Sequence, residues 1–187
     1  MCKPKSLGGL GFRNLQAFNL ALLAKQARRI LTNPHSLAAR ILKAKYFPYC
    51  DVLNASLGSK PSYTWRSIYN SLEVLKRGTR WRVGNGRRIH IWDDKWLPTP
   101  STFKVITTPP RITEDYPMVS SLIDPNTRWW KIDSVRAIFL RIDADAILKI
   151  PLSFNLPEDR IIWIGNNKGE YSVKSAYFIA VNLLEFV

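Results

Sequence analysis

Two adjacent acids, Asp93 and Asp94, are the residues whose types and spacing most suggest chemistry. Adjacent carboxylates at a hairpin turn can hold two metal ions, provided that a third carboxylate reaches them from another strand. Here the pair follows an expected strand, and the upstream acids Asp51 and Glu73 fall in an expected loop and on an expected helix. We therefore expect the pair to cap the following turn or to bind an arginine nearby.

The other acids that stand in pairs suggest no catalysis either. Asp143 and Asp145 flank a single residue, and Glu158 and Asp159 directly precede an expected strand. Neither pair has a neighbouring histidine, which a nucleophilic or acid–base arrangement would require. No catalytic role is therefore expected for these acids.

The histidines and cysteines are few and widely spaced. His35 falls at the start of a helix and His90 in an alternating strand, where a lone histidine is more often exposed or hydrogen-bonded than catalytic. The two thiols, Cys2 and Cys50, cannot supply a four-ligand zinc site even together with both histidines. The sequence therefore predicts no catalytic residue, no metal site, no cofactor and no small-molecule substrate.

Arginines and tryptophans gather between residues 79 and 98. Arginines can neutralise phosphates while flat aromatic faces stack on exposed bases, so this composition suggests contact with RNA or single-stranded DNA. The alternative places the tryptophans inward as core and leaves the arginines as a solvated rim. The candidate nucleic-acid-binding residues are Arg80, Trp81, Arg82, Arg87, Arg88 and Trp92.

The charge of the whole chain also suggests a polyanion as partner. The 187 residues contain 28 Lys and Arg against 14 Asp and Glu, a formal net charge of +14. An excess spread along the chain is weaker evidence than a clustered basic face. Lys25, Arg28 and Arg29, for example, crowd the end of an expected helix, where the helix dipole favours positive charge in any case.

The elements around the candidate residues are predicted to form a β-hairpin. Residues 80–83 and 88–92 each alternate large and polar side chains, which is typical of short half-exposed strands. Gly84–Gly86 would form the turn, because glycine and asparagine tolerate the positive φ angles of a tight hairpin.

Three helices are expected before this hairpin, the first starting at the good N-cap residue Asn14, the second at Ser36 and the third at the cap residue Ser62. The second helix should place Leu37, Ile41 and neighbouring apolar residues on one side. The third carries a stripe at helical spacing from Trp65 to Leu75 that is typical of core. The predicted buried stripe of the first helix is Leu15, Phe18, Leu22, Leu23, Ala27 and Ile30.

The part after Pro98 is expected to be mixed. Its proline- and threonine-rich start favours extended chain, and it should continue with helices over 129–140 and 143–148. A second hairpin is expected between 160–164 and 169–173, followed by a last helix to Leu184. We therefore predict an α+β fold with a helical-plus-hairpin region at 1–98, a linker at 99–117 and a small α+β region at 118–187.

The sequence also resembles a known family, and several motifs in the same order carry the resemblance. The run W-x-V-G-N-G-x-x-I-x-I-W-x-D-x-W-L-P, from Trp81 to Pro98, is similar to a segment of plant LINE-type (non-LTR) retrotransposon polyproteins. In that family the segment lies between the reverse transcriptase core and a zinc-binding segment. Agreement extends over about residues 3–178, through Gly8-Gly-Leu-Gly-Phe12, Asn14-Leu15, Phe18-Asn19-x-Ala21-Leu-Leu-Ala-Lys-Gln26, Lys45-Tyr-Phe-Pro48, Pro61-Ser62-x-x-Trp65-Arg-Ser-Ile68 and Tyr171-Ser-Val-Lys-Ser-Ala-Tyr177.

The resemblance implies a non-catalytic fragment, because this region lies outside the family's polymerase core and before its zinc ligands. Of the two adjacent acids, only Asp94 falls on the family's pattern. The chain also looks like uncharacterised plant mitochondrial reading frames that are similar to such elements. An alternative is therefore a domesticated or relic reading frame that interacts with protein or has no selected function.

The sequence contains no feature that directs the chain to a membrane. No apolar run approaches the ~18 residues needed to cross a bilayer, and the N-terminal Met-Cys-Lys-Pro-Lys lacks an apolar signal region. We expect a soluble intracellular protein, nuclear or cytoplasmic, with the mitochondrion as an alternative. The oligomeric state is left open.

Overall fold

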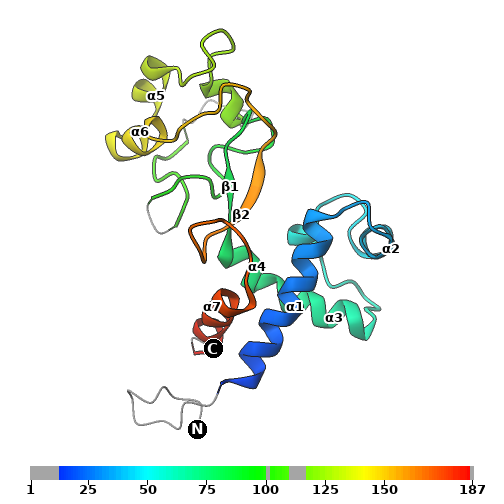
Figure 1. The fold of residues 1–187 in the computed structure, drawn as a ribbon. Helices are drawn as coiled ribbons and strands as arrows, with labels where there is room; N and C mark the ends of the chain where they lie inside the picture. The colour runs from blue at the N-terminus through cyan, green and yellow to red at the C-terminus, as the bar shows by residue number, and fades with distance from the viewer. Residues whose placement is uncertain (1–12, 100–101, 110–116, 186–187) are drawn as a thin grey trace, which may run out of the picture. The chain divides into compact units, whose positions relative to one another are not determined.

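The computed structural model describes residues 13–99, 102–109 and 117–185 (Figure 1). The chain divides into two compact units. Unit 1 comprises Met1–Gly78 and Trp163–Val187, and unit 2 comprises Thr79–Ile162. The expected linker at 99–117 falls inside unit 2 and is only partly described, so the predicted domain division stays a prediction. The glycine-rich motif at residues 8–11 and Cys2 lie outside the described residues.

Unit 1 is helical. It contains α1 (Leu15–Thr32), α2 (Leu37–Tyr46), the 3₁₀ turn η2 (Val52–Asn54), α3 (Tyr63–Asn70), α4 (Leu72–Gly78) and α7 (Val173–Glu185). The expected caps Asn14 and Ser62 are confirmed, and Ser36 at the expected start of α2 is a cap too. Each of these side chains accepts a hydrogen bond from a backbone N–H three residues on. These oxygens satisfy donors that have no partner inside the helix.

The buried face of α1 differs from the predicted stripe. Its buried residues are small ones, with the sole exception of Ile30, whereas Leu15 and Leu22 of the predicted stripe are exposed. Helix α7 packs against α1 and buries its own small residues, Ala176 and Ala180. Small side chains let two helix backbones approach closely, so packing with α7 selects this face over the larger leucines. The buried residues of α1 are Ala17, Ala21, Ala24, Ala27 and Ile30.

This close packing predicts that Ala24→Leu lowers the free energy of unfolding by about 1–3 kcal/mol, the usual cost of overpacking a tight core. Thermal or denaturant unfolding followed by circular dichroism would measure the change. The matched control is Leu22→Ala on the same helix, which should cost under about 1 kcal/mol because Leu22 is exposed. Equal destabilisation by the two variants would contradict the assignment of the buried face.

Trp65 on α3 lies at the centre of a second group of contacts in unit 1. Its ring is fully buried and stacks on Tyr46 at a centroid distance of 4.8 Å and an interplanar angle of 8°. Its Nε1 donates to the carbonyl oxygen of Leu57 over 3.2 Å. The core role predicted for this stripe is confirmed, since Leu72 and Leu75 are also buried. The single expected helix is broken at Ser71, which separates α3 from α4.

The second expected helix begins and ends as predicted, but its apolar side is not buried. Ala39 is the one residue of α2 that is buried, whereas Leu37 and Ile41 are 71% and 57% exposed. The apolar side expected for α2 is therefore exposed at Leu37 and Ile41.

Unit 2 contains β1 (Thr79–Arg82), η3 (Val119–Leu122), α5 (Ile132–Ile138), α6 (Arg141–Leu148) and most of β2 (Arg160–Trp163). Trp163, the last residue of β2, belongs to unit 1. Helix α5 buries Val135, and Phe139 just beyond it is buried too, whereas Ile132 and Ile138 are exposed. With the helices of unit 1 and the two-stranded antiparallel sheet, the predicted α+β class is confirmed.

The partner of β1 is not the predicted one. β1 pairs with β2, about 80 residues later in the chain, and not with residues 88–92. The second expected arm instead meets η3, because Val119 N donates to Ile89 O over 2.9 Å and His90 forms an isolated bridge with Met118. The hairpin across Gly84–Gly86 is therefore wrong, although the loop itself is present.

The second expected hairpin is also wrong in its return arm. Residues 169–172 form no strand, and Asn166 is hydrogen-bonded to Glu170 in a tight loop. Helix α7 begins at Val173 and runs to Glu185, as predicted. Among the described residues, no helix is both long and apolar enough to cross a membrane.

Candidate nucleic-acid interface

The loop that follows β1 is held by a buried carboxylate from far along the chain. Asp159, which is 3% exposed, accepts hydrogen bonds at Oδ1 from Gly84 N over 2.7 Å and Gly86 N over 2.9 Å. Its Oδ2 accepts from Arg88 N over 3.0 Å. Three charge-assisted hydrogen bonds fix the backbone of this loop without involving the side chains of its arginines. Sequence reasoning gave Asp159 no specific role, because nothing local marks it as the partner of a loop about 75 residues away.

Two of the candidate arginines lie on the surface of this loop. Arg87 and Arg88 are exposed, and the Asn85 side chain accepts a hydrogen bond from Arg87 N over 3.1 Å. The guanidinium carbon of Arg88 lies 5.5 Å from the centroid of the Trp81 ring, a cation–π distance. Arg82, at the end of β1, is exposed as well.

Arg80 has a different position. Its side chain is half-buried, and its Nη1 donates to the carbonyl oxygen of Trp96 over 3.4 Å. Burial lowers the pKa of the Arg80 guanidinium, and the positive charge of Arg82 lowers it further. The guanidinium carbon also lies 6.0 Å from the Phe103 ring centroid. These contacts serve the packing of unit 2.

The two candidate tryptophans pack against the hydrophobic core of unit 2. Trp81 and Trp92 are half-buried, and the Trp92 ring lies 5.3 Å from that of Phe139 at 34°. The Trp92 Nε1 is buried without a hydrogen-bond partner among the described residues. This placement favours the alternative in which the tryptophans are core and the arginines form the surface.

The adjacent acids form a local turn. Asp94 Oδ2 accepts a hydrogen bond from His90 N over 2.7 Å, and Asp94 N donates to His90 O over 3.2 Å. Asp93 is exposed. Asp94 therefore caps the turn from His90 to Asp94, whereas the expected turn is the one that follows the pair.

A second buried carboxylate holds another loop of unit 2. Asp143 is fully buried, and its Oδ2 accepts from Ile106 N over 2.9 Å and from Thr107 N over 2.7 Å. The Thr107 hydroxyl also donates to it, over 2.6 Å. Asp143 is therefore structural. Over residues 13–99, 102–109 and 117–185, no group of three or more His, Cys, Asp or Glu side chains could hold a metal ion.

Two curated proteins of Arabidopsis thaliana are similar to this chain. An uncharacterised mitochondrial protein is 47% identical over 98 residues, which are 52% of this chain and 64% of that protein. A protein with the name "Putative ribonuclease H protein" is 30% identical over 184 residues, which are 95% of this chain and 29% of that protein. The chain thus spans less than two thirds of the length of either relative. No protein-family model and no solved structure matches it.

Proposed function

We propose that this chain is the non-catalytic region of a plant LINE-type retrotransposon polyprotein that lies between the polymerase core and the zinc-binding segment. The ordered motifs over residues 3–178 support this origin. The similarity along 95% of the chain to 29% of a longer protein also fits a piece of a polyprotein. The name of that relative includes ribonuclease H, and in our proposal such an activity belongs to other parts of the longer protein.

The biochemical role that we propose for this region is contact with RNA or single-stranded DNA. One observation carries it: Arg82, Arg87 and Arg88 are exposed around a loop whose backbone Asp159 holds in place. Phosphate contacts of this kind position a strand without reading its sequence. A fixed loop loses little conformational entropy when the arginines bind, which favours affinity.

Charge reversal at the loop tests this role. Arg87→Glu combined with Arg88→Glu should weaken binding to a uridine-rich RNA 12-mer by at least about tenfold at moderate salt, because two phosphate contacts become repulsive. The log–log dependence of affinity on salt should flatten by roughly 1–2 units. Fluorescence anisotropy across a salt series measures both quantities, and circular dichroism verifies the fold.

The matched control is Arg136→Glu combined with Lys149→Glu, which changes the net charge equally at exposed positions elsewhere in unit 2. This control should keep most of the affinity. If the loop variant is folded and binds like the control, the loop is not the binding surface, and the basic helices around Arg28 and Arg40 become the candidates.

A second candidate role is a protein-interaction module, and one feature of unit 1 favours it. Leu37 and Ile41 are one helical turn apart on α2 and are 71% and 57% exposed. Tyr63, the first residue of α3, is 88% exposed. Exposed apolar side chains in a group often mark contact surfaces. If the unmutated protein shows no salt-dependent binding to nucleic acid, the role as a protein-interaction module is the better one.

A further inference from the structure

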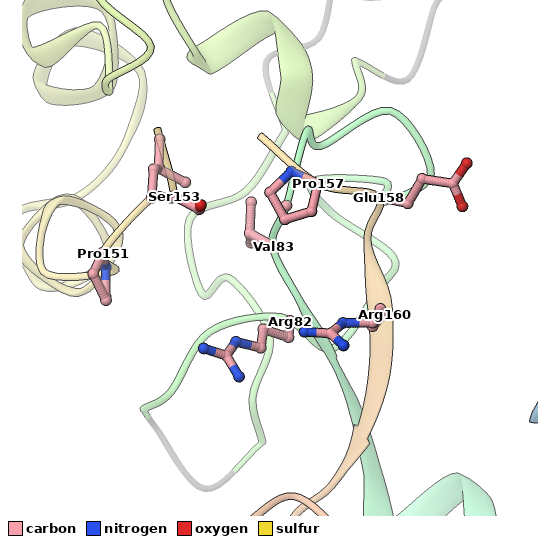
Figure 2. A pocket seen from close by; sticks show the side chains of 9 residues that line it. Arg82, Val83, Pro151, Ser153, Pro157, Glu158 and Arg160 are labelled. Atoms are coloured by element: carbon pink, nitrogen blue, oxygen red, sulfur yellow. The ribbon is translucent and has the colours of Figure 1, made fainter. Parts of the chain in front are cut away.

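A pocket of about 320 Å³ lies in unit 2 beside the end of β1 and the start of β2 (Figure 2). Because the strands are antiparallel, the last residue of β1, Arg82, and the first residue of β2, Arg160, come to the same end of the sheet. Both line the pocket, together with residues of the segment from Pro151 to Glu158. Sequence reasoning missed Arg160, since the pairing of β1 with β2 was not foreseen.

The charge at this pocket is positive and unneutralised. Arg82 and Arg160 are exposed, and among the described residues neither side chain forms a hydrogen bond or an ion pair. Like charges at one end of a sheet repel each other, and an anion bound beside both would relieve that repulsion. Glu158 is the acid at the rim, and Figure 2 shows its carboxylate on the opposite side of β2 from the Arg82 side chain.

The rest of the wall is apolar with one hydroxyl group. Val83, Leu152 and Pro157 supply apolar surface, and Figure 2 shows the Ser153 hydroxyl directed toward Val83. Ser153 makes no side-chain hydrogen bond within the described residues. A pocket with an apolar wall, a lone hydroxyl and two guanidinium groups offers contacts for a flat ring, a hydrogen-bonding edge and a phosphate.

The wall is also held rigidly. Asp159, between Glu158 and Arg160, binds Gly84 N and Gly86 N, so the strand ends are fixed relative to each other by a buried contact. The backbone there is so close that a Cβ atom on Gly84 would lie 2.0 Å from Pro157 O. A binding site on such a frame keeps its geometry without a ligand.

We propose that this pocket binds one nucleotide of a single-stranded nucleic acid, with Arg82 and Arg160 at its phosphate and the base against the apolar wall. The proposal rests on the proposed function, since it names the place where the strand is gripped. The volume of the pocket lies at the lower end of the range of small-molecule sites, which suits one nucleotide and no more.

Equilibrium binding of the uridine-rich RNA 12-mer tests the pocket. Arg82→Gln combined with Arg160→Gln should weaken binding by roughly tenfold and flatten the salt dependence by about 1.4 units of log–log slope, the loss of two phosphate contacts on a single strand. The control of equal charge is Arg136→Gln combined with Lys149→Gln. Ser153→Leu narrows the pocket without changing the charge and should weaken binding about threefold or more with an unchanged salt slope.

The outcomes separate this proposal from the one on which it rests. If the parent protein binds no RNA, the proposed function fails. If it binds, while the arginine variant and Ser153→Leu are folded and match the control, nucleic-acid contact stands and the pocket proposal is overturned. Uridine monophosphate is the second probe. Displacement of the RNA by the free nucleotide at millimolar concentration supports a pocket that holds one nucleotide of the strand. Equal displacement from the folded arginine variant, or no displacement from the wild-type protein, would overturn it.

Discussion

Asp159→Ala should destabilise unit 2 by about 3–5 kcal/mol, because it removes a buried acceptor of three backbone hydrogen bonds. The N–H groups of Gly84 and Gly86 are buried and would be left without a partner. Since the contact joins residues 84–88 to the start of β2, the loss should also loosen the pairing of β1 with β2. Denaturant unfolding followed by tryptophan fluorescence measures the change, since five of the seven tryptophans, Trp81, Trp92, Trp96, Trp129 and Trp130, lie in unit 2.

Its neighbour supplies the matched control. Glu158 is exposed, so Glu158→Ala removes the same charge one residue away and should change the unfolding free energy by less than about 0.5 kcal/mol. A loss below about 1 kcal/mol in Asp159→Ala would contradict the central role of this carboxylate. In that case the loop would be held chiefly by its own backbone geometry.

Gly84→Val combined with Gly86→Val should prevent unit 2 from folding, with an expected cost above about 5 kcal/mol. The two positions fail for different reasons. Gly86 has φ +69°, which a β-branched residue strongly disfavours, and a Cβ atom there would lie 2.5 Å from Ser120 N. Gly84 has no such angle, but its Cβ would collide with Pro157 O. Loss of cooperative thermal unfolding is the expected observation.

Gly58 in unit 1 separates the effect of a positive φ angle from the effect of a steric collision. Gly58 has φ +77°, yet a Cβ atom there would meet its nearest neighbour, the Tyr46 ring, at 3.9 Å. Gly58→Ala should therefore lower the free energy of unfolding by only about 1–2 kcal/mol, the cost of the backbone conformation alone.

If the double valine variant at Gly84 and Gly86 melts within a few degrees of the unmutated protein, the close approach of the loop to Pro157 and Ser120 is not a feature of the folded protein.

Local chemistry accounts for what could be predicted from the sequence. The helix starts follow from Asn14, Ser36 and Ser62, whose side-chain oxygens need only a backbone N–H three residues away. The turn that ends at Asp94 is local too, since Asp94 accepts a hydrogen bond from His90 N four residues earlier, although the prediction placed the capped turn after the pair. The α+β class follows as well, because periodicity and glycine positions are local signals.

The exposure of the candidate residues was predicted only in part. Arg82, Arg87 and Arg88 lie on the surface, while Arg80 and Trp92 are packed into unit 2. Alternation along a strand predicts two faces but cannot say which is covered, because that depends on elements that arrive later in the chain. Whether the exposed arginines bind nucleic acid stays a prediction.

Tertiary structure decided the rest, for one physical reason: long-range contacts have no local signal. The sequence contains a strand at 79–82, but only the fold supplies β2 as its partner and Asp159 as the anchor of its loop. In the same way, the stripe of α1 that is buried is the alanine stripe, because α7 approaches from that side. The sequence by itself determined where helices begin and which residues can carry charge. Close packing between distant segments determined which faces are covered, and it brought Arg160 and Arg82 to the same pocket.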